Sequence, residues 1–323
     1  MSHSTLCLSP TSPDLEDLIK KTRTYIHDAK APATLRAYQT DFEDFVRFCR
    51  EHNLPHLPAT PTTVALYIAD RAGSLRSATI TRRLISINKA HQAAGLEDSP
   101  ASSRHLIVNE TLKGIRRAIG TAQQGKAPLL TADIRRIVDS CPGTLSGLRD
   151  RALVLIGFAG AFRRSELAAI DHADLSFTEE GLVIHIRRSK TDQEASGRKL
   201  GIPFGSEEAT CPVRALGRWL AGSGIRDGRV FRGVDRHGKV ARRGLNKDCV
   251  CWILKQAARR AGMDAGPLGG HSLRSGHVTQ AVINGVGELD IMRQTGHKSV
   301  STLAKYVRIG KLFTRNSTVH LGI

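Results

Sequence analysis

The chain has 323 residues, 40% of them hydrophobic, which is more than one hydrophobic core usually holds, so we expect two domains. Its 48 Lys and Arg residues outnumber its 30 Asp and Glu residues, and the net charge of +18 favours an anionic partner such as nucleic acid. The longest apolar run, Ala152 to Phe162, is far shorter than the roughly 20 residues of a membrane-spanning helix, which argues against a membrane protein. Residues 1–13 show no secretory signal, so we expect a cytoplasmic location.

Four segments of the first 120 residues carry apolar residues at helical spacing. They are residues 34–51, a segment opened by Thr60 and Pro61, a segment opened by Ser77 that carries Ile80, Leu84 and Ile87, and residues 108–119. Thr34 and Thr60 stand where they can cap the first two helices, and Pro61 suits a first helical turn. The sequence therefore predicts an all-helical N-terminal bundle.

Three pairs of adjacent arginines are candidate DNA contacts, because exposed guanidinium groups bind phosphates. They are Arg82 with Arg83, Arg116 with Arg117, and Arg242 with Arg243. The first two pairs lie on the third and fourth predicted helices. Taken alone, these two pairs fit a solvated charged face better than a binding site.

A segment without apolar periodicity, from Ala122 to Pro128, indicates a linker. We place the domain boundary near Lys126, which gives domains 1–125 and 126–323, and we expect Thr131 to cap the next helix. Residues 1–125 hold 16 Lys and Arg against 12 Asp and Glu, whereas residues 126–323 hold 32 against 18. Most of the positive charge therefore belongs to the second domain.

The second domain is predicted to combine helices with a small antiparallel sheet. Residues 182–188 and 199–204 form the two convincing strands, and polar residues at 195–197 predict the turn of a β-hairpin. The apolar run at 152–162 predicts a buried helix, and another helix is expected at 288–294. The predicted fold class is therefore mainly α, with an all-α N-terminal bundle and an α+β C-terminal domain.

Six cysteines are spread thinly along the chain, which is typical of reduced thiols rather than of a disulfide framework. They are Cys7, Cys49, Cys141, Cys211, Cys249 and Cys251. Cys249 and Cys251 are separated by one residue and have no matching His or Cys pair, so they lack the spacing of a zinc site. We expect both to pack on a helix, and we expect no metal site.

Several residues of the second domain can act together on a phosphate. They are Arg163, Lys190, His271, Arg274, His297 and Tyr306. Arg163 precedes Glu166 by about one helical turn, so that the carboxylate can hold the guanidinium. His271 and Arg274 are three residues apart, which puts both on one helical face. Each of these signals is weak alone, and only the ordered set is specific.

The ordered set closely resembles the motifs of the tyrosine recombinase, or phage integrase, family. The matching segments are residues 161–167 (AFRRSEL), 188–190 (RSK), 271–274 (HSLR), 295–297 (TGH) and Tyr306. The resemblance spans nearly the whole chain, in a Cre/Xer-like two-domain arrangement. It implies a SAM-like core-binding domain at 1–125 and a catalytic domain with the DNA breaking-rejoining enzyme fold at 126–323. Arg164 departs from the commonest pattern, because an apolar residue often stands there.

The resemblance also implies a reaction. Tyr306 would attack a phosphate of duplex DNA and form a 3′-phosphotyrosyl bond, and strands would be exchanged through a Holliday junction. His271 would accept the tyrosine proton, and Lys190 would protonate the leaving 5′ oxygen. Because the covalent bond keeps the energy of the bond that is broken, rejoining needs no ATP, and the absence of a P-loop motif agrees.

By the same resemblance, Arg163 and Arg274 would grip the non-bridging phosphate oxygens and His297 would bind the same phosphate, with Glu166 in support. With His271 and Lys190, the two arginines and His297 make five assisting groups, which would replace a metal ion. The sequence shows no clustered carboxylates of the kind that two-metal nucleases use. We therefore expect no metal or other cofactor and no small-molecule substrate.

Double-stranded DNA is the expected partner, and the resemblance implies a homotetramer on paired recombination sites, as in the integration of a mobile element. The apolar tail from Ile309 to Ile323 would dock on a neighbouring protomer or fold back on its own domain. Three other functions stay open: type IB topoisomerase-like activity, a catalytically inactive DNA-binding regulator of the same fold, and a basic helical protein that binds nucleic acid by charge alone. The complete set of site residues favours the recombinase.

Overall fold

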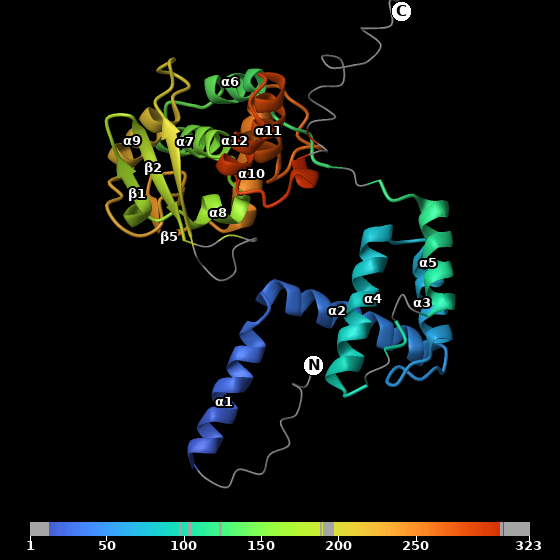
Figure 1. Cartoon of the computed structure of the whole chain (residues 1–323). Helices are drawn as coiled ribbons and strands as arrows, with labels where there is room; N and C mark the ends of the chain where they lie inside the picture. Colours follow the sequence, from blue (N-terminus) through green and yellow to red (C-terminus); the bar gives the residue numbers. More distant parts are fainter. Residues whose placement is uncertain are drawn as a thin grey trace, which may run out of the picture. The chain divides into compact units, whose positions relative to one another are not determined.

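The chain forms two compact units in a computed structural model, Met1–Gln124 and Gly125–Ile323 (Figure 1). The structure describes residues 13–96, 99–101, 105–122, 125–187, 189, 197–303 and 306. Helices predominate in the described parts of both units, and the β-strands found there all belong to the second unit.

The first unit is helical, as the sequence predicts. Its described helices are α1 (Pro13–Asp28), α2 (Pro32–Glu51), α3 (Pro61–Arg71), α4 (Ser77–Ala93) and α5 (Leu106–Ile119). Helices α2 to α5 share one core, whose fully buried side chains include Phe45, Tyr67, Ile68, Ile80 and Ile87. The periodic apolar residues of the predicted helices are thus the residues that pack against one another.

Two helix starts of this unit test the predicted caps. The Thr60 hydroxyl accepts a hydrogen bond from the amide of Thr63 (3.1 Å), and Pro61 occupies the first turn of α3, as predicted. The prediction that Thr34 caps α2 is wrong, because α2 begins at Pro32 and its N-cap is Ala31. Proline is favourable at a first helical position, because its missing amide hydrogen has no partner there in any helix.

Helix α1 has no counterpart among the predicted helices. It carries acidic residues in its first turn, which suits a helix N-terminus, but its Leu18, Tyr25 and Ile26 side chains are exposed. Leu15, Leu18, Ile19 and Ile26 recur at helical spacing, so the sequence does carry the periodic signal of this helix, and the prediction missed it.

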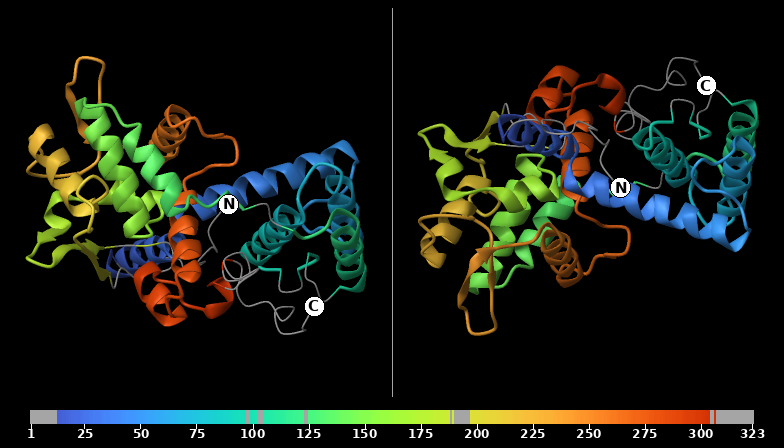
Figure 2. Two further views of the ribbon diagram at one scale, coloured as in Figure 1. Left: turned by 90° about the horizontal axis from the view of Figure 1, so that it is seen from above. Right: turned by 90° about the horizontal axis from the view of Figure 1, so that it is seen from below.

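The second unit is arranged around α7 (Leu145–Ala159). Its other described helices are α6 (Thr131–Asp139), α8 (Arg164–Ala169), α9 (Pro212–Ser223), α10 (Lys247–Arg260), α11 (Ser272–Ile283) and α12 (Glu288–Thr295). Residues 152–156 of α7 are almost entirely buried, which confirms the predicted core helix. Figures 1 and 2 show α7, in green, between the yellow strands and the orange to red helices α10–α12.

A three-stranded antiparallel sheet covers one side of this core, in the order β1 (Leu175–Phe177), β2 (Gly181–Ile186) and β3 (Arg198–Pro203). Strands β2 and β3 pair with Leu182 opposite Ile202 and Ile184 opposite Leu200, which confirms the predicted hairpin. The predicted turn residues Ala195 and Ser196 lie outside the described residues. A second hairpin, β4 (Arg232–Val234) with β5 (Val240–Gly244), has no counterpart in the predictions, because its exposed residues show no apolar alternation.

The start of α6 also differs from its prediction. Thr131 is the first residue of the helix and Leu130 is the N-cap, so Thr131 does not cap it. The amide of Leu130 instead donates a hydrogen bond to the Asp133 carboxylate (2.9 Å). This is the carboxylate half of a capping box, in which the residue at the third helical position pairs with the amide of the N-cap residue.

A close approach between α11 and the segment before α6 sets the position of the motif at 271–274. A Cβ atom on Gly276 would lie 1.8 Å from the carbonyl oxygen of Leu129, so only glycine fits at this contact. The amide of Leu129 donates a hydrogen bond to the carbonyl of Ser272 (3.2 Å). The first turn of α11 is therefore held directly against the backbone that enters the second unit.

Three findings on the described residues concern membrane-spanning helices, metal binding and the cysteines. Within those ranges, no helix combines the length and the apolar character needed to cross a membrane. A search of the same residues finds no cluster of three His, Cys, Asp or Glu side chains placed to bind a metal ion. The five described cysteines are free thiols, and Cys249 and Cys251 lie partly buried on α10. Cys7 lies outside the described residues.

Candidate active site

The turn between α7 and α8 carries the first basic residue of the site. Ala161 in this turn is fully buried and has a φ of 49°, a left-handed conformation that is strained for a residue with a side chain. Arg163 then forms the N-cap of α8. The buried Glu166 carboxylate accepts hydrogen bonds from Arg163 N (3.0 Å) and Nη1 (2.6 Å), which is the ion pair that the spacing predicts. The pair fixes the direction of the guanidinium.

Arg274, in the first turn of α11, is among the largest fully buried side chains, with 1% relative exposure. Its Nη1 donates to the carbonyl of Ala161 (2.7 Å), so the strained turn and α11 are joined next to Arg163. Burial, followed by the nearby charge of Arg163, lowers the pKa of Arg274 to about 10. The guanidinium is therefore a desolvated cation, which an anion in the same site would stabilise.

His297 follows the C-terminus of α12, where Gly296 ends the helix in the left-handed conformation (φ 70°). Arg274 Nη2 lies 3.1 Å from His297 Nε2, and an arginine can only donate. His297 Nε2 is therefore the acceptor, and the proton on Nδ1 points to Thr295 Oγ1 (2.8 Å). Burial, followed by Arg274 and Arg163, lowers the pKa of His297 to about 4.

Tyr306 lies against the same end of α11. Its Oη is 3.0 Å from Nε2 of His271, the N-cap residue of α11. Tyr306 packs against a small apolar cluster formed by Val278, Val282, Ile291 and Leu303. Its half-buried position raises the pKa of the phenol, although Arg274 opposes the shift. The phenol is therefore protonated at neutral pH and has a possible proton acceptor within hydrogen-bond distance.

The described residues thus bring five of the six sequence-predicted site residues into one region. Arg274 connects the turn before Arg163 to His297, and His271, on the same helix, contacts Tyr306. Lys190, the sixth residue, falls in the sequence between β2 and β3 and lies outside the described residues.

One residue of this region is absent from the predictions. Arg198, the first residue of β3, donates from Nη1 to the carbonyl of Gln294 near the end of α12 (3.0 Å). Burial lowers the pKa of Arg198, while the neighbouring charge of Glu166 opposes that shift and Arg163 adds to it. No sequence signal marks this arginine, because it is one of many basic residues in the second domain and is far in sequence from its partners.

The arginine pairs predicted to contact DNA fall into two groups. Arg82 binds Asp41 through Nε (2.7 Å) and Nη2 (2.9 Å), and Arg83 binds both Asp44 and the Tyr67 hydroxyl within the first unit. The Arg83 side chain is only 14% exposed. These contacts hold α4 to α2 and α3, so Arg83 has a structural role in the fold.

The other candidate arginines present their guanidinium groups to solvent. Arg116 and Arg117 lie on the exposed face of α5, and Arg242 and Arg243 lie on β5 of the second hairpin.

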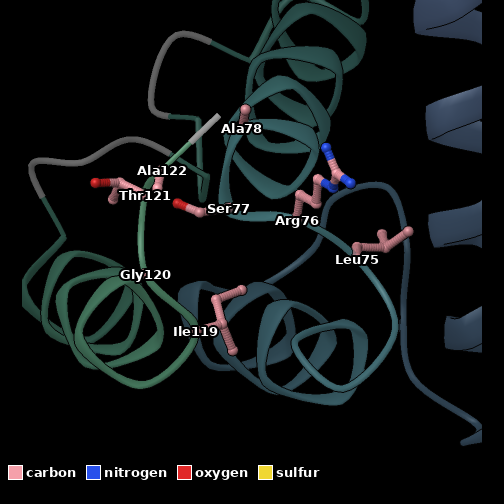
Figure 3. A pocket seen from close by; sticks show the side chains of 8 residues that line it. All are labelled: Leu75, Arg76, Ser77, Ala78, Ile119, Gly120, Thr121 and Ala122. Carbon is pink, nitrogen blue, oxygen red and sulfur yellow. The ribbon is translucent and has the colours of Figure 1, made fainter. Parts of the chain in front are cut away.

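Figure 3 shows a pocket on the first unit where α4 begins and α5 ends. It is lined by Leu75, Arg76, Ser77, Ala78, Ile119, Gly120, Thr121 and Ala122.

Two family models match the chain. The model described as the phage integrase family matches residues 128–311, and the model described as the phage integrase N-terminal SAM-like domain matches residues 23–98. The two matches fall in the second and the first compact unit, respectively.

Known proteins resemble the chain over most of its length. An integrase/recombinase xerD homolog of Selenomonas ruminantium is 38% identical over 94% of this chain and 89% of the relative. A tyrosine recombinase XerC of Myxococcus xanthus is 26% identical over 91% of this chain and 94% of the relative. Among solved structures, a λ integrase tetramer bound to a Holliday junction superimposes with a TM-score of 0.61, at 14% identity, over 90% of this chain and 76% of that chain.

Proposed function

The chain belongs to the phage integrase family of site-specific tyrosine recombinases, and we propose that Tyr306 is the nucleophile with which it cuts and rejoins duplex DNA. The observation that carries this proposal is the 3.0 Å contact between His271 Nε2 and Tyr306 Oη. It joins a potential base to a potential nucleophile beside the buried guanidinium of Arg274.

In the proposed cleavage step, Tyr306 Oη attacks the phosphorus of a DNA phosphodiester while the proton of the phenol passes to His271 Nε2. The bond from phosphorus to the 5′ oxygen breaks, and the phosphate stays attached to Tyr306 as a 3′-phosphotyrosyl ester. The leaving 5′ oxygen takes a proton, for which we assign Lys190 as the donor. The reverse step, attack by a 5′ hydroxyl of another strand, restores a phosphodiester without ATP.

The charged groups of the site suit the transition state of this step. Attack on the phosphate concentrates negative charge on the two non-bridging oxygens, and preorganised cations stabilise that charge best where water is excluded. Arg274 is buried and Arg163 is directed by Glu166, so neither guanidinium has to be ordered during the reaction. We assign both to the non-bridging oxygens, with His297 as a further contact.

Arrival of a phosphate would change the contact between Arg274 and His297. In the structure, His297 Nε2 accepts a hydrogen bond from Arg274 Nη2, so His297 offers no proton on that nitrogen. An anion between the two side chains offsets the surrounding positive charge, which raises the pKa of His297 from about 4. His297 can then donate to a phosphate oxygen.

We assign DNA binding to both units. Residues 1–125 would act as the core-binding domain and residues 126–323 as the catalytic domain, with Arg116, Arg117, Arg242 and Arg243 as exposed contacts to the phosphate backbone. Arg82 is half exposed and remains a candidate, whereas Arg83 serves the ion-pair cluster instead. The enzyme would act in the cytoplasm on double-stranded DNA, with no small-molecule substrate.

Recombination of two duplexes requires four cleavages, so we propose that four copies assemble on paired sites and exchange strands through a Holliday junction. The λ integrase tetramer, bound to such a junction, shares the fold of this chain and supports the proposal. The tail from Ile309 to Ile323, which lies outside the described residues, is the segment we assign to contacts between protomers.

Trapping of the covalent intermediate tests the function. The substrate is a nicked duplex from DNA that flanks the gene, chosen by searching that DNA for short inverted repeats that the chain binds, and the fragment released by cleavage diffuses away. The chain should give a covalent protein–DNA band on a denaturing gel, and Tyr306→Phe should give none while binding the same duplex with similar affinity. Tyr25→Phe, which alters an exposed tyrosine of α1, is the matched control.

Two outcomes of this experiment, and one of a plasmid-relaxation assay, would reject the proposal. A covalent band that persists in Tyr306→Phe would place the nucleophile elsewhere. Binding without any covalent band in the unaltered chain would indicate an inactive DNA-binding regulator. Relaxation of supercoiled plasmids that lack the inverted repeats would indicate type IB topoisomerase activity.

A further inference from the structure

Arg198 connects three elements around the candidate active site. Its Nη1 donates to the carbonyl of Gln294, close to the C-terminus of α12 (3.0 Å). The Gln294 side chain in turn donates to the carbonyl of Ala159, at the end of α7 (3.1 Å), and more weakly to Gly201 on β3 (3.4 Å). The end of α12 is thereby fixed to the sheet and to the helix that precedes Arg163.

The guanidinium of Arg198 also lies against the turn that presents His297. A Cβ atom on Gly296 would lie 3.1 Å from Arg198 Nε and 3.3 Å from its Cζ, which is closer than most Cβ contacts. Gly296 has a φ of 70°, so glycine is favoured at this position for its conformation and for the space that Arg198 occupies. Movement of Arg198 would free the turn immediately before His297.

Arg198 has an unused donor. Its Nη2 is buried and has no hydrogen-bond partner in the described structure, as is also true of Arg274 Nε. Leaving a buried charged donor unpaired costs free energy that a nearby anion would recover. Glu166 is the carboxylate that acts on Arg198, and its oxygens are already bound to Arg163.

Arg198 also acts electrostatically on two other residues of the site. Burial is the largest cause of the lowered pKa of Arg274 and His297, and the charge of Arg198 is a smaller contribution in the same direction to both. Glu166, which is paired with Arg163, also acts electrostatically on Arg198 and Arg274, so one carboxylate opposes the charge of three guanidinium groups. A bound anion would offset this excess of buried positive charge and so stabilise the site.

We propose that Arg198 is a third guanidinium of the phosphate site, which positions the turn carrying His297 and adds its charge to the stabilisation of the bound phosphate. This inference rests on the proposed function, because it names the scissile phosphate as the anion. Arg198 acts through the turn and through its charge, so it is a positioning residue rather than the acid or base of the reaction.

The variants Arg198→Gln and Arg198→Lys separate charge from shape. Arg136→Gln is the matched control, because Arg136 also donates one hydrogen bond to a backbone carbonyl at a helix C-terminus, that of Ala261 (3.1 Å), on the exposed side of α6. Thermal unfolding of each variant shows whether the fold is kept, and all comparisons use variants that remain folded at the assay temperature.

The first measurement needs no DNA. In the unaltered chain, the ring signals of His297 in an NMR titration should change near pH 4. Removal of a neighbouring cation should raise this pKa in Arg198→Gln, whereas Arg198→Lys and Arg136→Gln should leave it close to the unaltered value. An equal His297 pKa in Arg198→Gln and in the unaltered chain overturns the inference, even if the proposed function is correct.

The second measurement uses two versions of the nicked substrate, one with the natural scissile phosphodiester and one with a neutral methylphosphonate at that position. Arg198→Gln should cleave the phosphodiester about 10- to 100-fold more slowly, a loss of the size expected for one preorganised donor. On the methylphosphonate the loss should shrink to about threefold or less, and Arg198→Lys should retain most activity on both.

Failure of the inference about Arg198 can be distinguished from failure of the proposed recombinase function. An equal loss on both substrates means that Arg198 acts on the fold alone, and the inference is then wrong. Absence of cleavage by the unaltered chain, or cleavage by Tyr306→Phe, rejects the proposed function and leaves the titration of His297 as the decisive result for Arg198.

Discussion

His271 Nε2 lies 3.0 Å from Tyr306 Oη, although the two residues are 35 positions apart in the sequence. His271 is exposed and Tyr306 is half buried, so the hydrogen bond lies at the edge of the site where DNA can reach it. The phenol has a raised pKa because it is half buried, and it therefore stays protonated unless a neighbouring base accepts its proton. Without that base, the pH dependence of the cleavage rate should follow the ionisation of Tyr306 itself.

His271→Ala is expected to slow the first cleavage step about 10²- to 10⁴-fold at pH 7, the usual size of a general-base contribution. The pKa of Tyr306 lies above its ordinary value of about 10, so the phenolate fraction rises about tenfold per pH unit between pH 7 and 9. Cleavage by His271→Ala should rise with the same slope, as measured in single-turnover assays. The exposed His237→Ala is the control, and a flat pH profile in His271→Ala would assign the base elsewhere.

Lys190→Ala should be rescued by a substrate whose leaving group is a 5′-bridging sulfur, because a thiolate leaves without being protonated. Arg274→Ala should not be rescued, since its buried guanidinium would stabilise charge on the non-bridging oxygens in both substrates. Cleavage rates of the two variants on oxygen and sulfur substrates provide the comparison. Equal rescue of both variants would mean that Lys190 only binds the phosphate.

Cleavage should proceed at an unchanged rate in excess EDTA and without nucleotide, because protein side chains supply the charges and the protons of the proposed reaction. Loss of cleavage on chelation with recovery in Mg²⁺ would contradict this mechanism.

Binding of duplex DNA should weaken steeply with salt, with a slope of about −0.9 in log affinity against log salt concentration for each phosphate that is neutralised. Fluorescence anisotropy over a salt series measures that slope, and Arg116→Ala should make it shallower by about one phosphate.

Asp44→Asn should destabilise the first unit by about 2 to 3 kcal/mol, because Arg71 and Arg83 lose their shared partly buried carboxylate. Among the described carboxylates, Arg71 then keeps only its pair with Asp70, and Arg83 keeps only a longer contact to Asp41 (3.8 Å). Loss of amide protection in α2 and α4, measured by hydrogen exchange on the full chain, reports the effect. Asp70→Asn removes an exposed ion pair of Arg71 and should cost less than about 1 kcal/mol. Equal protection in the two variants would show that the Asp44 cluster does not stabilise the unit.

The lowered pKa of Asp44 predicts that the first unit is destabilised by acid. Burial alone would raise the pKa of Asp44, but hydrogen bonds from Arg71, Arg47 and Tyr67 outweigh burial and hold the pKa at about 2, below the ordinary 3.8. A carboxyl with a lowered pKa in the folded state stabilises the fold above its unfolded pKa and loses that contribution as the pH falls. Protection of the first unit should therefore fall between about pH 4 and pH 2, and less so in Asp44→Asn.

Deletion of residues 310–323 should leave binding to a single site intact while synapsis of two sites and recombination decrease together, if the tail docks on a neighbouring protomer. Gel shifts with one and two sites measure binding and synapsis. Loss of single-site binding, or unfolding of the shortened chain, would show instead that the tail belongs to its own domain.

Local chemistry could be predicted from the sequence because it depends on residues that are near neighbours in the chain. The ion pair of Arg163 with Glu166 and the cap of α3 by Thr60 each join residues three positions apart, where helical geometry sets the distance. The buried helix α7 and the β2–β3 hairpin follow in the same way from apolar periodicity. The starts of α2 and α6 were misplaced because a helix need not begin at a hydroxyl residue. Helix α2 begins at Pro32 without a side-chain cap, and in α6 the Asp133 carboxylate pairs with the N-cap amide.

The sequence by itself determined the family, the order of the motif residues and the two-part helical architecture, since these depend on residue identity and short-range spacing. Only the tertiary structure decided which distant groups meet. Arg274 reaches the carbonyl of Ala161, 113 positions away, because Gly276 lets α11 pack directly on Leu129. Arg198 reaches the turn before His297 only because β3 lies beside the end of α12. Spacing in the sequence specifies neighbours along one helix or strand, whereas contacts between elements depend on how their buried faces pack.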